Sequence, residues 1–168
     1  PDALVVDTLS VKTDMSRSAA AAKPRCGVVG VNPMFAPSLG MSGRVTALVV
    51  YDANPRVAEF TDLLTSRGTR VVRVDAEQHD RTVATTQALT HAAVLAFGTA
   101  AARLGVDPDL AIALGPPPHA TMSALLARIA TGTPEVYHDV QHGNPYAAAA
   151  RLALADAVRD LDSAAATE

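Results

Sequence analysis

An aspartate, a glutamine and a histidine share one face of a predicted helix in the middle of the chain. At about 100° per residue, Asp80, Gln87 and His91 fall within roughly 40° of one another. Histidine is the side chain best placed to act as an acid, a base or a hydrogen-bond partner near neutral pH. The stripe continues through the apolar or small Val94 and Gly98. It therefore predicts either a polar pocket in a packed domain or a half-exposed face whose polar end meets water.

Arg128 lies on the flank of an apolar helix face formed by Met122, Leu125, Leu126 and Ile129. The guanidinium group is a rigid fork that matches a carboxylate, so this arginine is a candidate ligand for an acidic substrate. The alternative is a surface arginine whose aliphatic stem packs on the helix.

Two histidines, His138 and His142, have the i, i+4 spacing of zinc-binding helices. The acid between them is Asp139, where that motif has glutamate, and no third ligand is obvious. Gly143 and the following Asn-Pro end the helix at once. We therefore expect surface or helix-end histidines and no metal site.

The segment from Asn32 to Pro37, Asn-Pro-Met-Phe-Ala-Pro, directly follows a predicted buried strand. Its prolines, beginning with Pro33, force an extended and rigid loop. In open α/β sheets, ligands bind at the carboxyl ends of the strands. Ser10 and Lys12 follow the first strand in the same way, so the sequence predicts a ligand site at this edge. A purely structural turn is the alternative.

Two stretches of different character must position these residues. The first alternates short β-branched runs, typical of strands buried on both faces of a parallel sheet, with helices, which indicates an α/β layer. The sequence contains no G-x-G-x-x-G fingerprint, and its Gly-Val-Val-Gly run reads as part of a strand. Strands are expected at Leu4–Asp7, Gly27–Val31, Val45–Tyr51 and Arg70–Val74, and helices from Ser10 as N-cap to Ala22 and from Asn54-Pro55 to Gly68.

From Asp75 onwards the sequence predicts only helices. Asp75 and Gln78 form a capping-box-like pair that starts a helix running to Leu104, with Gly105 as its stop. The later helices are separated by a Gly-Pro-Pro-Pro break at 115–118 and by the pairs Thr133-Pro134 and Asn144-Pro145, each an N-cap followed by a first-turn proline. We expect two domains, 1–75 and 76–168, the second with alanine-rich faces that allow close packing, including packing between two subunits.

Composition narrows the class of protein. The net charge of −3 over 168 residues gives no case for a nucleic-acid or membrane partner. No run approaches the ~20 apolar residues of a membrane span, and the first residues lack the basic segment of a signal peptide. The sequence has a single cysteine, Cys26, so a disulfide framework is excluded and a cytoplasmic location is favoured. We expect Cys26 to be a buried, inert thiol. Because the chain starts inside a strand, we expect it to be the back part of something longer.

Several segments resemble, in this order, motifs of the prephenate dehydrogenase family. The resemblance covers nearly the whole chain, and the motifs are strong together. They are Asp7–Lys12 for D-x-x-S-V-K, Asn32–Pro37 for H-P-M-F-G-P, His79-Asp80 and Gln87–His91 for H-D…Q-A-L-x-H, then Arg128, Thr133–Asp139 and Asn144.

The resemblance implies both a fold and a reaction. The fold is α/β followed by all-α, in which the last strands of a Rossmann-type parallel sheet, a partial nucleotide-binding domain, precede a helical dimerisation domain. The implied enzyme carries out oxidative decarboxylation of a prephenate-type cyclohexadiene diacid, in aromatic amino-acid or specialised metabolite biosynthesis. C4 of the diacid loses hydride to NAD or NADP, and the ring carboxylate leaves as CO2. A homodimer through the helical domain is implied as well.

The family's residue roles carry over by position. Ser10 would hydrogen-bond near the C4 substituent and orient residue 32, His91 would line the substrate pocket as a catalytic hydrogen-bond partner, and Arg128 would bind a carboxylate. The protein supplies orientation while the cofactor carries the hydride chemistry. The resemblance also implies that Lys12 and Gln87 contact the substrate and that Asp80 supports the residues of the site. The cofactor would be contacted by Ser10, Lys12 and Pro33.

One residue departs from the family pattern. Asn32 stands where the family has its catalytic histidine, and asparagine has no site that is basic at neutral pH. General-base help is worth about 10²–10⁴-fold, so turnover of prephenate itself should be slow. Either the substrate carries an amine at C4, as in 4-amino-4-deoxyprephenate, or the chain is a catalytically weakened binding or dimerisation module. A metal hydrolase using His138 and His142 would leave the ordered motifs unexplained.

Overall fold

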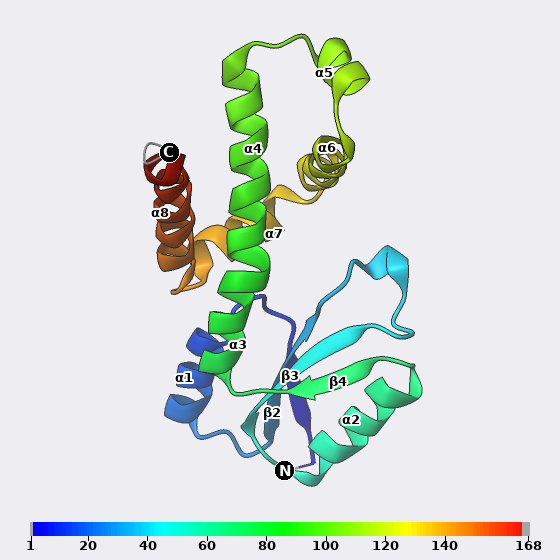
Figure 1. The fold of residues 1–168 in the computed structure, drawn as a ribbon. Coiled ribbons are helices and arrows are strands. Elements are labelled where there is room, and N and C mark those ends of the chain that lie inside the picture. The colour runs from blue at the N-terminus through cyan, green and yellow to red at the C-terminus, as the bar shows by residue number, and fades with distance from the viewer. Residues whose placement is uncertain (1, 166–168) are drawn as a thin grey trace. The chain divides into compact units, whose positions relative to one another are not determined.

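The computed structural model describes the backbone of residues 2–165 and their side chains, other than those at 136 and 162–165. The chain divides into two compact units, Pro1–Thr82 and Val83–Glu168, and each is described by itself (Figure 1). The first unit contains nearly all of α3 (Ala76–Val83), the helix with which we expected the second domain to begin.

The first unit is built on a four-stranded sheet in the order β1-β2-β3-β4. The strands β1 (Leu4–Asp7), β2 (Gly27–Pro33), β3 (Val45–Asp52) and β4 (Arg70–Arg73) lie where the sequence predicts them. The expected α/β class is confirmed, but the parallel order is corrected at one pairing.

That pairing is β2 with β3, which run antiparallel, whereas β1 pairs with β2 and β3 pairs with β4 in parallel. Parallel neighbours need a long crossover, and here α1 (Thr13–Ala22) and α2 (Pro55–Ser66) supply two of them. Between β2 and β3 the chain forms only the short 3-10 helix η1 (Pro37–Leu39), so β3 returns antiparallel beside β2.

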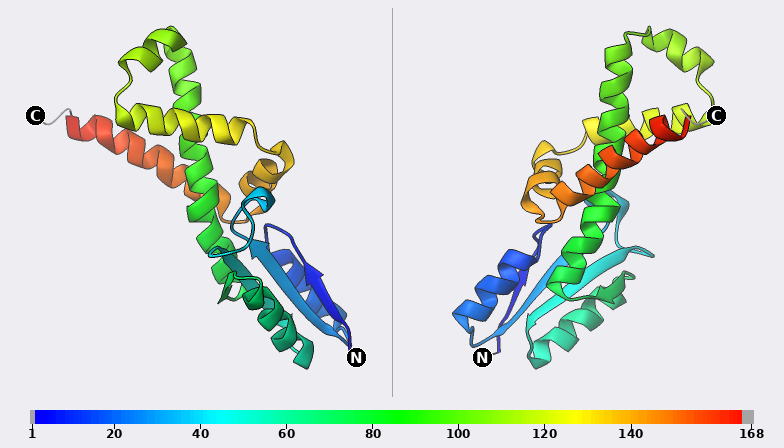
Figure 2. Two further views of the ribbon diagram at one scale, coloured as in Figure 1. Left: turned by 90° about the vertical axis from the view of Figure 1, so that its right-hand side faces the viewer. Right: turned by 60° about the vertical axis from the view of Figure 1, so that its left-hand side comes forward.

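The alternation of side chains along β2 creates two different faces. Val29 and Val31 form an apolar cluster with Leu48 of β3 and Val57 of α2. The alternate residues Gly30 and Asn32 face the opposite side of the sheet, because successive strand side chains alternate. The helices α1 and α2 cover the two faces of this sheet (Figure 2).

Most predicted helix ends are confirmed. Asp75 Oδ1 accepts the Gln78 backbone N–H at 2.7 Å, and Gly68 and Gly105 follow their helices with φ of 84° and 66°. The prediction of Ser10 as N-cap was wrong, because α1 begins at Thr13. A distant carboxylate caps this helix, as described below, and no local pattern reveals such a cap.

The second unit is entirely helical in the described residues. The helix predicted from Asp75 to Leu104 contains a π-helical segment, η2 (Ala84–Leu89), followed by α4 (Thr90–Leu104). The later helices are α5 (Pro108–Leu114), α6 (Pro117–Ala130), α7 (Pro134–His138), the π-helical η3 (Asp139–Gly143) and α8 (Ala147–Ala165).

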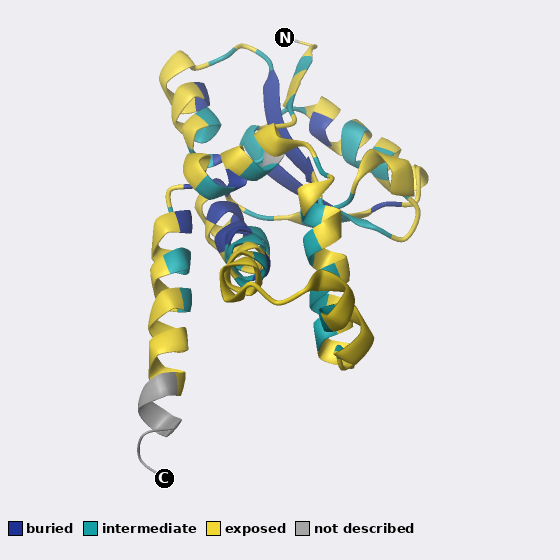
Figure 3. Ribbon diagram, turned by 90° about the horizontal axis from the view of Figure 1, so that it is seen from above, coloured by how far each residue is buried: buried dark blue, intermediate teal, exposed yellow. Residues whose placement is uncertain are grey.

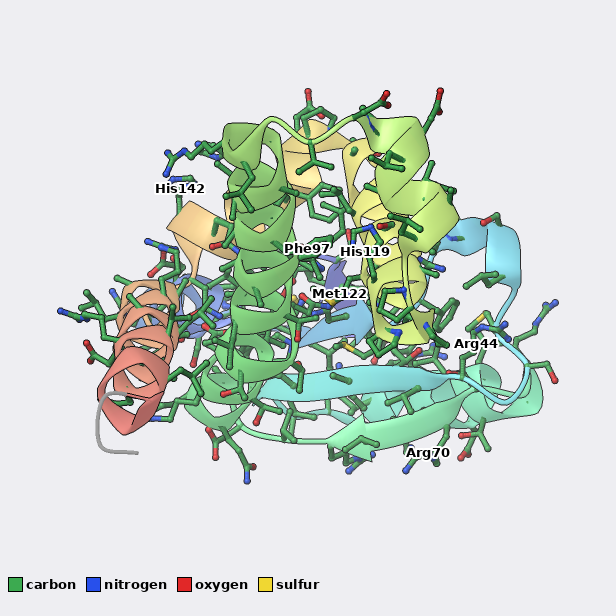
Figure 4. All side chains as sticks on the ribbon, turned by 45° about the horizontal axis from the view of Figure 1, so that its top comes forward. Arg44, Arg70, Phe97, His119, Met122 and His142 are labelled. Carbon is green, nitrogen blue, oxygen red and sulfur yellow. The ribbon has the colours of Figure 1, made fainter. Side chains whose placement is uncertain are left out.

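Small residues let these helices approach closely. A buried cluster of Ala88, Val140 and Ala147 joins η2, η3 and the start of α8. On α4, a Cβ added at Gly98 would lie 2.5 Å from a methyl group of Leu126 on α6. Phe97 and His119, which lie in the same region of α4 and α6, meet edge to face with their ring centres 5.6 Å apart (Figure 4).

Burial differs between the two units. Buried residues are concentrated on β2 and β3, whereas the helices of the second unit carry many exposed positions (Figure 3). Large apolar side chains such as Leu104, Ile112 and Leu152 are 78%, 72% and 64% exposed. In the described part of the chain no single helix is long and apolar enough to cross a membrane. One pair of helical segments has the length and apolar composition of a membrane span when taken together, but is bent by 115° at the break between Ala76–Leu104 and Pro108–Leu114.

Candidate functional site

A buried lysine ties the loop after β1 to the end of β2. Lys12 is fully buried, and its ammonium donates to Asp7 Oδ1 at 2.6 Å and to the Val31 carbonyl at 2.9 Å. Burial lowers the pKa of Lys12, and the neighbouring Asp7 carboxylate opposes that change. The loop carrying Ser10 is thereby held beside the carboxyl end of β2, where Asn32 lies.

The carboxylate of Asp80 caps helix α1 from 68 residues away in sequence. It accepts the backbone N–H of Lys12 at 2.9 Å and that of Thr13 at 2.8 Å, and it also accepts the Thr13 hydroxyl. Burial alone would raise the pKa of Asp80. Its hydrogen bonds from His79, Thr13 and the two backbone N–H groups outweigh this effect and lower the pKa.

The same carboxylate orients the neighbouring histidine and, through it, Asn32. His79 Nδ1 lies 2.8 Å from Asp80 Oδ1, and His79 Nε2 lies 3.2 Å from Asn32 Nδ2. The Asn32 NH2 group can only donate, so Nε2 is the acceptor and the ring proton lies on Nδ1, toward the carboxylate. The Asn32 amide therefore donates to His79, and its carbonyl oxygen Oδ1 is turned away from the histidine.

The predicted residues of the first unit gather at one edge of the sheet. Asn32 is 7% exposed at the end of β2, while Pro33, the next residue, is exposed. Ser10 is half-buried in the loop after the parallel neighbour β1. Lys12 is joined to the end of β2 at Val31, the residue before Asn32, and Ser10 lies two residues before Lys12 in the same loop. The Lys12 ammonium is already engaged by protein groups.

Sequence reasoning gave Tyr51 no role and mentioned His79 only as part of a motif. Tyr51 follows Ala47 and Val49 on the Asn32 face of the sheet, so strict alternation along β3 would have found it. Its hydroxyl and Asp7 Oδ2 occupy the space where a side chain at Gly30 would be. Neither atom has a hydrogen-bond partner in the described residues, and burial followed by the Asp7 carboxylate raises the pKa of Tyr51.

In the second unit, His91 is the most distinctive of the predicted residues. Its ring meets Tyr137 edge to face, with ring centres 4.9 Å apart and an interplanar angle of 71°. Burial lowers the pKa of His91, and its Nδ1 is buried without a partner among the described residues. Such a group is neutral at pH 7 and can still form a hydrogen bond.

The expected single stripe of Asp80, Gln87 and His91 requires correction. It assumed an uninterrupted α-helix, but the π-helical turn from Ala84 to Leu89 changes the turn per residue between the first and last of them. Gln87 is half-buried within this turn. The turn is fastened at Ala88, whose carbonyl accepts the Gln141 side-chain amide at 2.7 Å.

The remaining candidates are Arg128, the pair His138 and His142, and Cys26. Arg128 is exposed near the end of α6. The rings of His138 and His142 stack with centres 4.4 Å apart, and residues 2–165 contain no group of three His, Cys, Asp or Glu side chains placed to hold a metal ion. Cys26 is a free, half-buried thiol, so its expected full burial was wrong.

The described residues do not form a cradle for a dinucleotide pyrophosphate. A phosphate loop needs glycines whose missing side chains leave room for the ligand. At Gly27 the Asn54 side chain fills that space, because a Cβ added there would lie 2.5 Å from Asn54 Oδ1, and at Gly30 the space is filled by Tyr51 and Asp7. Of the residues predicted to contact the cofactor, Lys12 is fully buried, Ser10 is half-buried and Pro33 is exposed.

Fold and site together define an α/β unit with a polar, partly buried edge, followed by a helical unit that carries a half-buried neutral histidine. Residues 75–165 match the family model described as prephenate dehydrogenase, dimerization domain. The chain belongs to the prephenate dehydrogenase family.

Individual relatives agree with this assignment. The chain is 51% identical over 154 residues to the 4-amino-4-deoxyprephenate dehydrogenase of Streptomyces pristinaespiralis, a match that covers 92% of this chain and 52% of that protein. It is 30% identical over 140 residues to the T-protein of Enterobacter agglomerans, covering 83% and 37%. The chain therefore spans about half the length of the first relative and about a third of the second.

Solved structures share the fold. The A. aeolicus prephenate dehydrogenase in complex with hydroxyphenyl propionate and NAD+ matches with a TM-score of 0.69 and 18% identity, over 96% of this chain and 59% of that one. The Synechocystis arogenate dehydrogenase matches with a TM-score of 0.67 and 23% identity, over 96% and 60%.

Proposed function

We propose that the full-length protein carrying this chain catalyses the oxidative decarboxylation of a prephenate-type diacid that bears an amine at C4, 4-amino-4-deoxyprephenate. The observation that carries the proposal is Asn32, an amide at the end of β2 whose carbonyl oxygen is turned away from His79. The 51% identity to a relative of that name supports the same substrate.

The chemistry explains why an amide suits this substrate. The C4–H bond breaks with its electron pair leaving as hydride, the C1–carboxylate bond breaks to release CO2, and the ring becomes aromatic. A neutral amine can donate its lone pair to the ring without first losing a proton. Asn32 Oδ1 would accept one N–H of that amine and orient it. A hydroxyl in the same place would lack the base that assists it, worth about 10²–10⁴-fold.

The remaining roles are proposed for each unit separately. In the first unit, Ser10 would hydrogen-bond near the C4 substituent, and Lys12 would act by holding the Ser10 loop against Val31. Pro33 and Ser10 would contact the cofactor, NAD or NADP, which supplies the hydride acceptor when bound.

In the second unit, His91 would form a hydrogen bond to the substrate as a neutral imidazole, through the buried ring nitrogen that lacks a partner among the described residues. Arg128 would bind a substrate carboxylate, and Gln87 would support the substrate from the π-helical turn. A homodimer through residues 75–165 is part of the proposal, on the name of the matching family model and the exposed apolar side chains of the helices. A cytoplasmic location is proposed on the free Cys26 thiol.

The test is a cofactor-reduction assay of the purified full-length protein on prephenate, arogenate and 4-amino-4-deoxyprephenate, each with NAD and with NADP. We expect the highest kcat/KM with the 4-amino compound. Faster turnover of prephenate would overturn the proposal. Absence of turnover with all three would instead favour a binding or dimerisation module.

A further inference from the structure

Three side chains form a directed line of hydrogen bonds behind the proposed C4 site. Asp80, His79 and Asn32 are 0%, 2% and 7% exposed, so each of them meets protein groups and almost no water. The line runs from Asp80 Oδ1 to His79 Nδ1 at 2.8 Å, and from His79 Nε2 to Asn32 Nδ2 at 3.2 Å.

The direction of this line is set at the Asp80 end. The Asp80 carboxylate also accepts two backbone N–H groups and the Thr13 hydroxyl, which all favour its ionised form. An ionised carboxylate requires a donor at His79 Nδ1, and a neutral imidazole then has only an acceptor at Nε2. Only the NH2 end of the Asn32 carboxamide can satisfy that acceptor.

We propose that His79, held by Asp80, is a positioning residue that fixes the Asn32 carboxamide with Oδ1 as the hydrogen-bond acceptor offered to the ligand. The inference deepens the proposed function and rests on it for the identity of the ligand. A free asparagine amide can rotate by 180° and offer its NH2 group instead, because the two ends are nearly equal in shape. The rotated amide would donate to the C4 nitrogen and compete for the lone pair that the reaction needs.

Two substitutions at one position separate positioning from simple packing. In His79→Gln, the side-chain amide replaces the Nε2 end of the ring and can still accept from Asn32, while the hydrogen bond to Asp80 is lost. In His79→Asn, the shorter amide replaces the Nδ1 end, keeps the hydrogen bond to Asp80 and leaves Asn32 without a partner. Thermal unfolding of both variants provides the check on folding.

The kinetic test uses the full-length protein with 4-amino-4-deoxyprephenate. We expect His79→Asn to lower kcat about 10²-fold, as a misplaced reacting group does, with KM changed little. We expect a smaller loss of kcat in His79→Gln, because its amide can still accept from Asn32 although Asp80 no longer sets its direction. Equal losses in the two variants, or a larger loss in His79→Gln, would overturn the inference while leaving the proposed function standing.

A second readout needs no turnover. ¹⁵N NMR of the ring nitrogens of unaltered protein at neutral pH should find His79 with its proton on Nδ1 and an unprotonated Nε2. A proton on Nε2 would reverse the amide and overturn the inference, whatever the activity. If no C4 compound is turned over, the proposed function fails, and the tautomer of His79 still decides the orientation of Asn32.

Discussion

Replacing Asn32 with histidine should convert the site into one that uses prephenate. The side-chain nitrogen of asparagine and Nδ1 of histidine lie at the same distance along the side chain. A ring at position 32 can therefore donate Nδ1–H to His79 Nε2 across the present 3.2 Å contact. Its own Nε2 is then unprotonated and directed away from His79, where it can serve as the base that Asn32 lacks.

The size of the gain follows from two opposing effects. General-base help contributes about 10²–10⁴-fold to the rate. The larger ring must fit at a position that is only 7% exposed, and overpacking typically costs about 1–3 kcal/mol of stability. We therefore expect kcat/KM for prephenate to rise by about 10²-fold, at the lower end of the range.

The assay compares initial rates of cofactor reduction on prephenate and on the 4-amino compound for unaltered protein, Asn32→His and Asn32→Gln. The glutamine variant is the matched control, because it enlarges the side chain without adding a base. We expect no gain on prephenate with Asn32→Gln, and a smaller gain when Asn32→His is combined with His79→Asn. An unchanged prephenate rate in a folded Asn32→His protein would refute the argument that only the base is missing.

Three further predictions concern the buried polar groups. Lys12→Met should lower the free energy of unfolding by about 3–5 kcal/mol, because the Asp7 carboxylate stays buried without its cation. Urea denaturation measures this loss. A loss below about 1 kcal/mol, which is typical of exposed pairs, would contradict the prediction. Because the pKa of Asp80 is lowered from its usual 3.8, its contribution to stability is present above that pH and is lost as the pH falls through the folded-state value. Unfolding midpoints taken across acidic pH should show this loss, and Asp80→Asn should flatten the profile. Burial lowers the pKa of His91 from its usual 6.5, so an NMR titration should give a midpoint below 6.5, and a midpoint above it would remove the case for a neutral imidazole at pH 7.

Elements with strong local patterns were predictable from the sequence. The continuous apolar runs at 27–31 and 45–51 form the two central strands, and Gly105 ends α4 in the left-handed conformation that glycine adopts most easily. Asn144, predicted as an N-cap, accepts the Tyr146 backbone N–H at 2.9 Å, but α8 begins only at Ala147, so the helix starts two residues later than predicted. These features depend on neighbours within a few residues, so the sequence contains the needed information.

Features that depend on distant residues were not predictable in the same way. The antiparallel pairing of β2 with β3 depends on how the loop between them returns, and both directions suit an apolar run. The N-terminus of α1 was assigned to Ser10 because the actual cap, Asp80, comes from a helix much later in the chain. The π-helical turn at Ala84–Leu89 is fastened by Gln141, which no local period reveals.

The candidate site also has features that the local sequence determines and features that depend on distant residues. The sequence alone determined that an amide stands at position 32 where a base is expected, and that serine and lysine follow the neighbouring strand. Only the tertiary structure decided which end of that amide faces outward, because the direction is set by His79 and Asp80, 47 residues and more along the chain. A residue type fixes which hydrogen bonds a side chain can form, and the fold fixes which of them its neighbours have already taken.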